Sequence, residues 1–393
     1  MATPISTLTP WLHALTDTLA NLRTTTNCIR LGDLSGDGDY NLCICDIEKK
    51  LRVYKGSSQI VDYELLDTPN AMCIINMEVN SKIPSIAVAS NSNVFIYRQL
   101  RPYKKWTCPP LPVSAFEVNI WKDLNDNSST TDNAIHKLTE LRDQGVKLTS
   151  RSIELISLET EESKYILINE YKTIPLSHTA IITCMETLKK ENDEADALCM
   201  LVVGTESGHI YILPLDPTQS QYLCQVELPS APVSMVIQGV YDIDWRVSVI
   251  CRDGMLYHIK NGDKRNTAVL SGSINDIGSM PVCIARQDKN IWIACMDKSL
   301  SCFNLRGKKL HSILLSEDIV EICILDVKRS KISNLLLVIL ITGEVRLYKE
   351  TALIDSFRVS PPVSAVRFGS YGRYVCICTV YIYIIFLYGD VII

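Results

Sequence analysis

Six short segments of this chain repeat one layout, in which an apolar run is followed by a tight turn and a second apolar run. The clearest copy is "LVVGTESGHIYIL", from Leu201 to Leu213. The turns of the six copies lie near Asp46, Asn91, Glu206, Asp253, Asp297 and Thr342. The first two turns are 45 residues apart, and the last four are separated by 47, 44 and 45 residues. This period is typical of a four-stranded blade, so the repeats predict a β-propeller.

A second repeated element, a proline followed by apolar residues, marks the strand that opens a blade. It occurs as "APVSMV", "MPVCIA" and "PPVSAV". Proline suits the first position of a strand, because its missing N–H leaves no ladder hydrogen bond broken. One more period beyond Thr342 ends near Asp390. We therefore expect an all-β, seven-bladed propeller whose last blade begins at Pro361, with runs such as "LVVG", "SVIC" and "WIAC" as inner strands.

The region between the second and third hairpins departs from the period, with excess sequence between Pro112 and Ile174. The segment "TTDNAIHKLTELRDQG" places Ile135, Leu138 and Leu141 on one helical stripe. Its helix is expected to begin at a cap formed by Asp132 or Asn133 and to end at Gly145. The segment "SRSIELISLETEESKYILINEY" predicts a second helix. We therefore expect residues 113–174 to form a helical insertion between blades two and three.

Residues 374–393, "YVCICTVYIYIIFLYGDVII", are almost entirely apolar. The length suits a membrane span, but scattered tyrosines, many β-branched residues and Asp390 argue against one. The run can be encoded by an almost unbroken TA/TG alternation, and the junction after Arg373 is compatible with a splice donor. We therefore expect an intron read-through, with a propeller over residues 1–373 and a last blade that is incomplete or aberrant.

Charge and composition exclude several function classes. The net charge is −5 and no basic tract is long, so nucleic-acid binding has little electrostatic support. The N-terminus lacks the basic and apolar regions of a secretory signal. Many of the fifteen cysteines lie in strand-like runs and no C-x-x-C pair occurs, so we expect buried thiols and no zinc site. No histidine pair, nucleophile elbow or phosphate loop is present, so we expect no catalytic, cofactor or metal residues.

The loop "GDLSGDGDY", Gly32 to Tyr40, is the most distinctive candidate site. Asp33, Asp37 and Asp39 are oxygen ligands of the kind that calcium prefers, but their spacing differs from that of an EF-hand. Aspartate and glycine also favour tight turns, and the sequence favours this interpretation. A calcium-binding, integrin-like propeller is the corresponding alternative function, although only one such loop occurs.

The segment "RQLRPYKKW", Arg98 to Trp106, combines basic and aromatic residues. Arg101 is a candidate for contact with an acidic partner, with Tyr103 and Trp106 as interface anchors. Alternatively, the segment is a solvated connector whose aromatic side chains pack under the helical insertion.

Several longer strings, taken in order, resemble the amino-terminal propeller of the Bardet–Biedl syndrome protein 1 family of BBSome subunits, from about Trp11 to Arg373. They are "WLHALTDTLANL", "LGDLSGDGDYNL", "RQLRPYKKW", "TLKKENDEADALCMLVVGTES", "LPSAPVS", "GKKL", "TGEVRLYKETALI" and "FGSYGR". The resemblance stops at Tyr374, where the family continues into a linker, a helical region and an adaptin-ear-like domain.

This resemblance implies a non-enzymatic adaptor in ciliary membrane-protein trafficking, without cofactors. The implied partners are other BBSome subunits, membrane-protein cargo and an Arf-like small GTPase in its GTP state, with only indirect membrane contact. The implied locations are the cytoplasm, cilium, basal body and ciliary membrane. A generic propeller scaffold of another coat or of a ubiquitin-ligase complex is the alternative, although the W-D and G-H signatures are absent.

The family's GTPase contact uses the first and last blades. Its first half corresponds here to the segment from Asp37 to Gly56, and its other half lies after Pro361. The partner-binding residues that we expect are Asp37, Asp39, Tyr40, Lys49, Lys50, Arg52, Tyr54, Lys55, Arg101 and Tyr103.

Overall fold

The computed structural model describes most of the chain and divides it into two compact units. The described residues are 11–17, 22–78, 81, 83–126, 128–146, 148–194, 196–215, 221–262, 267–270, 275–325, 335–359, 363–380 and 383–388. The first unit comprises Met1–Trp106 and Ile181–Ile393, and the second comprises Thr107–Ala180.

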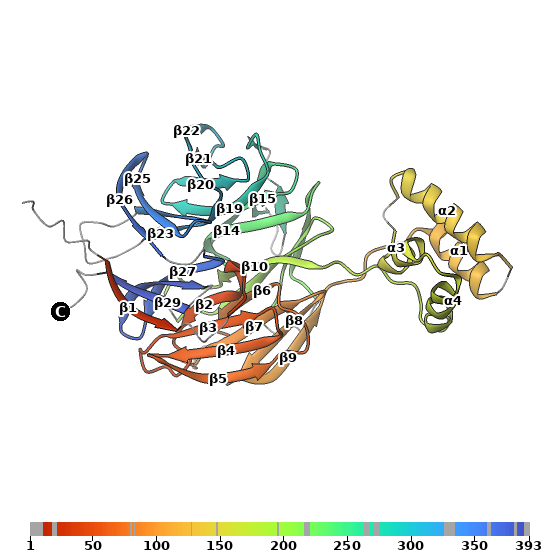
Figure 1. Cartoon of the computed structure of the whole chain (residues 1–393), viewed down its shortest axis with the longest axis horizontal. Coiled ribbons are helices and arrows are strands. Elements are labelled where there is room, and N and C mark those ends of the chain that lie inside the picture. The colour runs from red at the N-terminus through yellow and green to blue at the C-terminus, as the bar shows by residue number, and fades with distance from the viewer. Residues whose placement is uncertain are drawn as a thin grey trace, which may run out of the picture. The chain divides into compact units, whose positions relative to one another are not determined.

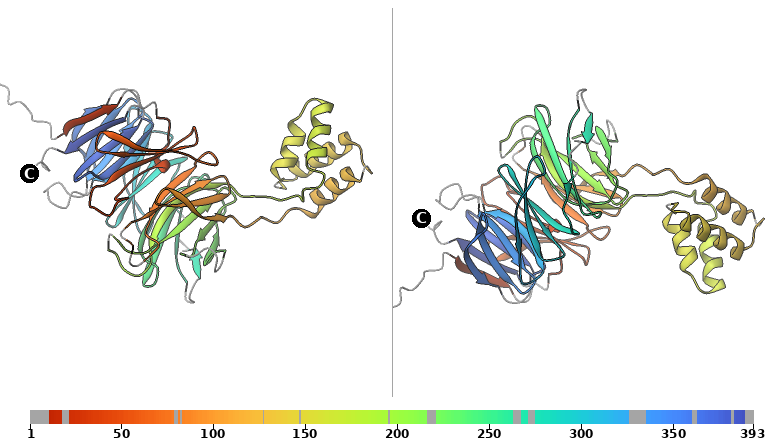
Figure 2. Two further views of the ribbon diagram at one scale, coloured as in Figure 1. Left: turned by 90° about the horizontal axis from the view of Figure 1, so that it is seen from below. Right: turned by 90° about the horizontal axis from the view of Figure 1, so that it is seen from above.

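The first unit is built from five four-stranded sheets and one nine-stranded sheet (Figures 1 and 2). The first sheet contains β2 (Ile29–Gly32), β3 (Asn41–Asp46), β4 (Lys50–Lys55) and β5 (Ser58–Glu64). The second contains β6 (Ala71–Ile75), β7 (Ser85–Ser90), β8 (Asn93–Arg98) and β9 (Arg101–Thr107). The next two contain β19 (Pro281–Gln287), β20 (Asn290–Cys295), β21 (Ser299–Asn304), β22 (Lys309–Leu314), β23 (Ile319–Leu325), β24 (Leu335–Leu340), β25 (Glu344–Lys349) and β26 (Ala352–Arg358).

The nine-stranded sheet joins two consecutive groups of strands through one parallel pairing, Lys189 with Val240. The first group is β10 (Ile182–Lys189), β11 (Cys199–Thr205), β12 (His209–Ile212) and β13 (Cys224–Glu227). The second group is β14 (Pro232–Val240), β15 (Asp244–Cys251), β16 (Met255–Asn261), β17 (Ala268–Leu270) and β18 (Asn275–Asp276).

The last sheet combines both ends of the described chain, in the order β1 (Trp11–Asp17), β29 (Tyr383–Tyr388), β28 (Tyr374–Val380) and β27 (Ala365–Tyr371). Trp11 pairs with Tyr388, so β1 closes a sheet whose other strands come from the end of the sequence. Strands β28 and β29 lie within residues 374–393, the segment that we expected to be aberrant.

The opening strands of the sheets follow one another in a closed circle of contacts. The contacts run from β2 to β6, β10, β14, β19, β23 and β27, and from β27 back to β2. Because each opening strand packs against the next and the last sheet returns to the first, the prediction of an all-β propeller-like fold is confirmed. Pro232 and Pro281 begin β14 and β19, as the repeated proline element predicted, whereas Pro361 lies outside the described residues.

The apolar runs of the repeats are not the innermost strands, which corrects our expectation. "LVVG", "SVIC" and "WIAC" lie in β11, β15 and β20, each the second strand of its group. These strands are apolar because neighbouring sheets bury both of their faces, as in β3 and β24, where every residue is buried. The opening strands instead line a channel of about 450 Å³ and carry Arg30, Glu186, Arg286, Glu321 and Arg367.

The second unit contains four helices where the sequence predicted two. They are α1 (Ala115–Asn125), α2 (Thr131–Asp143), α3 (Ser150–Ser157) and α4 (Glu161–Glu170). In α2 the predicted stripe is confirmed, because Leu138 is fully buried and Ile135 and Leu141 pack against the same core. The cap is Thr130, whose Oγ1 accepts a hydrogen bond from the Asn133 N–H, rather than Asp132 or Asn133.

The second predicted helix was wrong as a continuous element, because the structure breaks it into α3 and α4. Leu158 and Thr160 have extended backbone angles and flank the break. Helix α1 was missed altogether.

A buried carboxylate holds α1 to α3. Glu117 is fully buried, and its Oε1 accepts hydrogen bonds from the N–H and hydroxyl of Thr149, at 2.9 and 2.7 Å, and from the hydroxyl of Ser152. The indole N–H of Trp121 donates to the same Ser152 hydroxyl at 2.8 Å. The second unit therefore depends on a polar network as well as on its apolar core.

Candidate functional site

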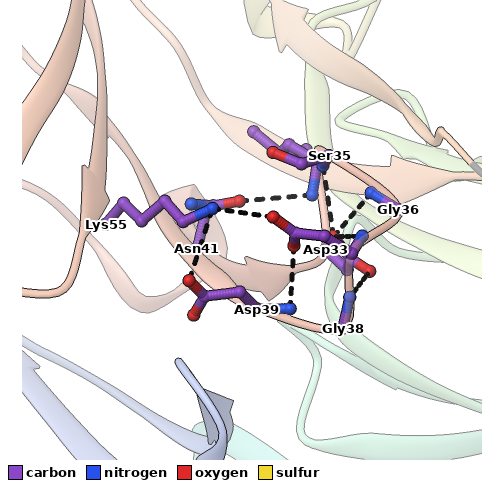
Figure 3. Close-up of polar contacts among 9 residues, drawn as sticks. Asp33, Ser35, Gly36, Gly38, Asp39, Asn41 and Lys55 are labelled. Atoms are coloured by element: carbon purple, nitrogen blue, oxygen red, sulfur yellow. Dashed lines mark hydrogen bonds and ion pairs between the residues drawn. The ribbon is translucent and has the colours of Figure 1, made fainter.

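The loop of residues 32–40, here called the Asp33 loop, connects β2 to β3 and is organised by one carboxylate (Figure 3). Asp33 Oδ1 accepts from the N–H of Gly36 at 2.7 Å, and its Oδ2 accepts from the N–H of Gly38 at 2.7 Å. Both glycines have positive φ, 71° and 78°, which non-glycine residues adopt rarely. The loop is therefore a tight Asx-type turn, as the sequence favoured.

The two other aspartates of the Asp33 loop lie beside Lys55 of β4, and Figure 3 labels Asp39 and Lys55. Lys55 Nζ lies 2.9 Å from Asp37 Oδ2 and 3.3 Å from Asp39 Oδ2. The hydrogen bond to Asp37 raises the pKa of Lys55, and the same contact lowers the pKa of Asp37. The ammonium of Lys55 thus occupies the position between the two carboxylates that a calcium ion would need. The geometry therefore favours a charged ridge, formed by the ion-paired side chains of Asp37, Asp39 and Lys55, over a calcium site.

The Asp33 loop also joins the first sheet to the last sheet. The Tyr40 N–H donates to Gly372 O at 3.0 Å, and the Gly372 N–H donates to Tyr40 O at 2.7 Å. The Tyr371 hydroxyl donates to Gly56 O at 2.6 Å, in the β4–β5 turn. The β27–β28 turn is therefore fixed beside the Asp33 loop and the β4–β5 turn.

An apolar hollow of about 230 Å³ lies beside the Asp33 loop. It is lined by Leu34 of that loop, by Ile60 of β5 and by Leu100 of the β8–β9 turn. Gln99 and Leu100 both have positive φ, 48° and 62°, a costly conformation for residues with large side chains. We call the surface formed by the Asp33 loop, the β4–β5, β8–β9 and β27–β28 turns and this hollow the loop-end face.

The structure separates the partner-binding residues that the sequence suggested. Asp37, Asp39, Tyr40 and Lys55 lie together on the loop-end face. Lys49 and Lys50 lie at the opposite end of the first sheet, because β4 runs away from them for about 20 Å at 3.3 Å per residue. Lys49 Nζ lies 3.5 Å from Asp67 Oδ1, and Lys50 Nζ lies 3.6 Å from Asp62 Oδ2.

Two of the suggested residues are buried and cannot present their side chains to a partner. Tyr54 is 2% exposed and packs between the first and last sheets. Arg52 is 9% exposed, and its guanidinium lies 3.5 Å from the buried Asp46 carboxylate. Arg52 and Tyr54 are two residues apart on β4 and therefore lie on the same face of the first sheet, the face on which Tyr54 packs against the last sheet.

The basic and aromatic segment after the second hairpin forms β9. Arg101 is exposed and directly follows the β8–β9 turn, so it lies at the loop end of the second sheet. Tyr103 is exposed, with Arg98 and Lys104 over its ring. Trp106, expected as an interface anchor, is instead buried in the first unit, where its indole N–H donates to Gln221 O and its ring packs against Tyr211.

Among the side chains that the structure describes, no group of three or more histidine, cysteine, aspartate or glutamate residues is arranged to hold a metal ion. None of the helices in the described part of the chain has the length and apolar character needed to cross a membrane.

Sequence reasoning missed the hollow and the turn that completes the loop-end face. Leu34, Ile60 and Leu100 are far apart in sequence and follow no common period, so no sequence signal links them. The "SYGR" string at Tyr371 and Gly372 did carry a turn signal, since glycine readily adopts the φ of 59° found there.

Comparison with known proteins agrees with this architecture. Residues 11–260 match the protein family described as "Ciliary BBSome complex subunit 1". The chain is 30% identical over 370 residues to "BBSome complex member BBS1" of Mus musculus and of Homo sapiens. These alignments cover 92% of this chain and 61% of each relative, so the chain spans about three fifths of their length.

The chain also resembles solved structures over nearly all of its length. One is described as "Crystal structure of BBS1N in complex with ARL6DN, soaked with mercury" and another as the same complex soaked with lead. Each has 30% identity and a TM-score of 0.76, and 97% of both chains is covered. The matched family is one of non-enzymatic BBSome subunits, which agrees with the prediction that the chain is not an enzyme. On the match to residues 11–260 and on these alignments, the chain belongs to the BBS1 family of ciliary BBSome subunits.

Proposed function

We propose that this chain is the propeller part of a BBSome trafficking adaptor, and that its loop-end face docks an Arf-like small GTPase in the GTP-bound state. The observation that carries the proposal is the joining of the first and last sheets at this face through Tyr40 and Gly372. The solved relatives are complexes with ARL6DN, which supports a small GTPase as the partner class.

The composition of the loop-end face suits a protein partner. The charged ridge of Asp37, Asp39 and Lys55 adjoins the hollow of Leu34, Ile60 and Leu100. Protein interfaces typically place an apolar centre inside a polar rim, and the hollow and the ridge have this arrangement. We therefore propose Asp37, Asp39, Tyr40, Lys55 and Arg101 as the polar contacts, with Tyr103 at the margin.

We also infer seven blades, with β10–β13 and β14–β17 as two of them. Among the described strands a single β-pairing, Lys189 with Val240, joins these two groups, and β10 and β14 occupy successive places in the circle of opening strands. In this description residues 113–174 are a helical insertion between blades two and three, and α1–α4 support that assignment.

The proposed origin of residues 374–393 is intron read-through. The tail is rich in β-branched residues, and such a segment can pair as β28 and β29 whatever its origin. Alignment of the transcript with genomic DNA tests this proposal. A spliced coding exon that spans Tyr374 onward would refute it.

In this proposal the propeller makes the location of the adaptor depend on the nucleotide that is bound to the GTPase. The switch loops of a small GTPase are ordered by the γ-phosphate, so its surface differs between the GTP and GDP states. A face that fits only the ordered surface recruits the adaptor where GTP-bound protein is displayed on a membrane. We propose the cytoplasm, basal body, cilium and ciliary membrane as its locations, and other BBSome subunits and membrane-protein cargo as further partners.

The decisive experiment is a binding titration of the full chain with GTP-locked and GDP-locked ARL6. We expect saturable binding of the GTP-locked form only. Lys55→Glu reverses the charge between Asp37 and Asp39 and should weaken binding by at least about tenfold, the effect of a lost interface contact of about 1.4 kcal/mol.

Lys50→Glu is the matched control, because Lys50 lies on the same strand at the opposite end of the sheet. Ile60→Asp, at an exposed position in the hollow, should weaken binding without involving the Asp33 loop. Equal binding of both nucleotide forms, or loss of binding in Lys50→Glu alone, would contradict the proposed face.

A further inference from the structure

A small cavity in the first unit gathers positive charge that the proposed GTPase contact does not use. It lies between β14–β16 and β19 and has a volume of about 150 Å³. Three cationic side chains line it, the exposed Arg246 and Lys260 and the half-buried Arg286, and none of the described residues that line it is acidic. Val236 and Arg286 also line the central channel, so the cavity adjoins that channel.

The sheet register brings these groups to one face. Arg246 on β15 pairs with Lys260 on β16, and Ser248 pairs with His258 two residues further along. Residues two apart on a strand point to the same side, so both pairs face the cavity. Like charges directly opposite each other destabilise a sheet, although solvent screens part of this repulsion because Arg246 and Lys260 are both exposed. A negative charge beside the pair would relieve the remaining repulsion.

The described side chains do not supply that charge to Arg246 or Lys260. No carboxylate among them lies within ion-pair distance of either group. Arg286 donates from Nε to the Asp288 carbonyl oxygen at 2.9 Å. Burial and then repulsion from Arg246 lower the pKa of Arg286, and the nearby Asp288 carboxylate offsets only part of this effect.

His258 adds a buried hydrogen-bonding group with no partner. It is 8% exposed, its Nδ1 lies 2.9 Å from the Ser248 hydroxyl, and its Nε2 has no hydrogen-bond partner among the described residues. Burial and then repulsion from Arg246 lower the pKa of His258, which keeps the ring neutral near pH 7. When the Ser248 hydroxyl donates to Nδ1, the proton lies on Nε2, which becomes a donor. Buried polar groups are normally satisfied, so this atom indicates a missing acceptor.

We propose that this cavity binds a phosphate-type oxyanion, either free phosphate or a phosphate monoester. Arg246, Lys260 and Arg286 supply the charge, and His258 Nε2–H supplies a directed hydrogen bond. A cavity of about 150 Å³ holds a ligand of about six heavy atoms such as benzene, so the five atoms of phosphate fit. Three cations favour a divalent oxyanion over a single carboxylate, because each added charge contributes further Coulomb attraction.

The test is thermal unfolding of the full chain during a titration with inorganic phosphate at constant ionic strength, with chloride as the balancing anion. Binding to the folded state alone raises Tm in a saturable way. We expect that rise in the wild type and a loss of affinity of at least tenfold in Arg246→Gln. Lys309→Gln, at an exposed position on β22, should behave like the wild type.

A second measurement separates binding from a structural role. Without phosphate, Arg246→Gln removes a repelling charge and should melt at or above the wild-type temperature, whereas loss of a structural arginine would lower Tm in every buffer. Lys260→Gln provides the same comparison if Arg246→Gln fails to fold. A non-saturating wild-type response, or wild-type affinity in both variants, would overturn the proposal.

Glycerol 3-phosphate, whose glycerol part would extend from the cavity into the adjoining channel, distinguishes the two sources of the oxyanion. An affinity similar to that for inorganic phosphate supports a monoester ligand, and binding of inorganic phosphate alone supports the free ion.

Discussion

The two units of this chain are stabilised in different ways. In the propeller unit, the interior strands of the sheets are buried on both faces, as in β3 and β24, and their apolar runs repeat along the sequence. In the helical unit, the core includes the carboxylate of Glu117 with its three hydrogen bonds to Thr149 and Ser152. The comparison shows that a repeated apolar interior can be recognised from sequence, whereas a single buried polar network cannot.

The largest expected effect comes from a charge placed in an interior strand of the propeller. Val203 of β11 is fully buried and pairs with Met185 and Tyr211. Val203→Arg should destabilise the propeller unit by more than about 5 kcal/mol, because the buried charge has no partner. Hydrogen exchange measured peptide by peptide should show lost protection in the sheets and retained protection in α1–α4.

The control for this experiment is Val269→Arg, at a position 46% exposed on β17, which should leave exchange unchanged. Normal solubility and melting of Val203→Arg would contradict the burial of β11. Simultaneous loss of protection in the helices would show that the two units unfold together.

Removal of the buried carboxylate should act on the other unit. Glu117→Ala leaves the Thr149 N–H and the two hydroxyls without their acceptor, so we expect a loss of about 4 kcal/mol confined to the helical unit. The same exchange experiment should show faster exchange in α1 and α3 and unchanged exchange in the sheets. Glu154→Ala, at an exposed position on α3, is the matched control. Equal effects of the two substitutions would mean that the network does not stabilise the unit.

The smallest expected loss of stability comes from replacing a matched pair of glycines, one in each unit, by alanine. Gly208 and Gly145 have similar φ values, 88° and 83°. A Cβ at Gly208 would lie 2.5 Å from Leu228 O, whereas a Cβ at Gly145 would meet nothing within 4 Å. Gly145→Ala should therefore cost only the backbone strain, about 1 kcal/mol, and Gly208→Ala at least about 2 kcal/mol.

Chemical denaturation of both variants, followed by hydrogen exchange in each unit, measures this difference. A larger loss in Gly145→Ala would show that the open end of α2 is more constrained than the turn between β11 and β12.

The sequence predicted the elements that depend on neighbouring residues. The period of about 45 residues located all six hairpins, and the stripe of Ile135, Leu138 and Leu141 located α2. The prediction from the apolar runs misplaced the inner strands of the propeller. An apolar run indicates that a strand is buried on both faces, and it does not indicate that the strand lies next to the central channel. Helix α1 was missed because its buried stripe begins with Glu117, ahead of Ile120 and Trp121, and a glutamate resembles an exposed residue in a sequence.

The features of the candidate site also divide into those that the sequence predicted and those that it did not. The turn chemistry of the Asp33 loop followed from its aspartates and glycines, and this part was predictable. The position of Lys55 between Asp37 and Asp39 depended on the pairing of β3 with β4, which places residues 16 to 18 positions apart side by side. The burial of Arg52 and Tyr54 could not be predicted from the sequence. The type of a polar or aromatic residue does not show by itself whether its side chain faces a neighbouring sheet or the solvent.

The amino-acid sequence by itself determined the repeated hairpins, the tight aspartate–glycine loop and the helical character of the region around residues 131–143, because these depend on local periodicity and turn chemistry. Only the tertiary structure decided which strands face the channel, how β1 meets β29, how Gly372 joins Tyr40, and how Arg246, Lys260 and Arg286 come to share one cavity. These contacts join residues that are distant in sequence, and their register is set by ring closure and side-chain packing, which leave no periodic signal in the chain.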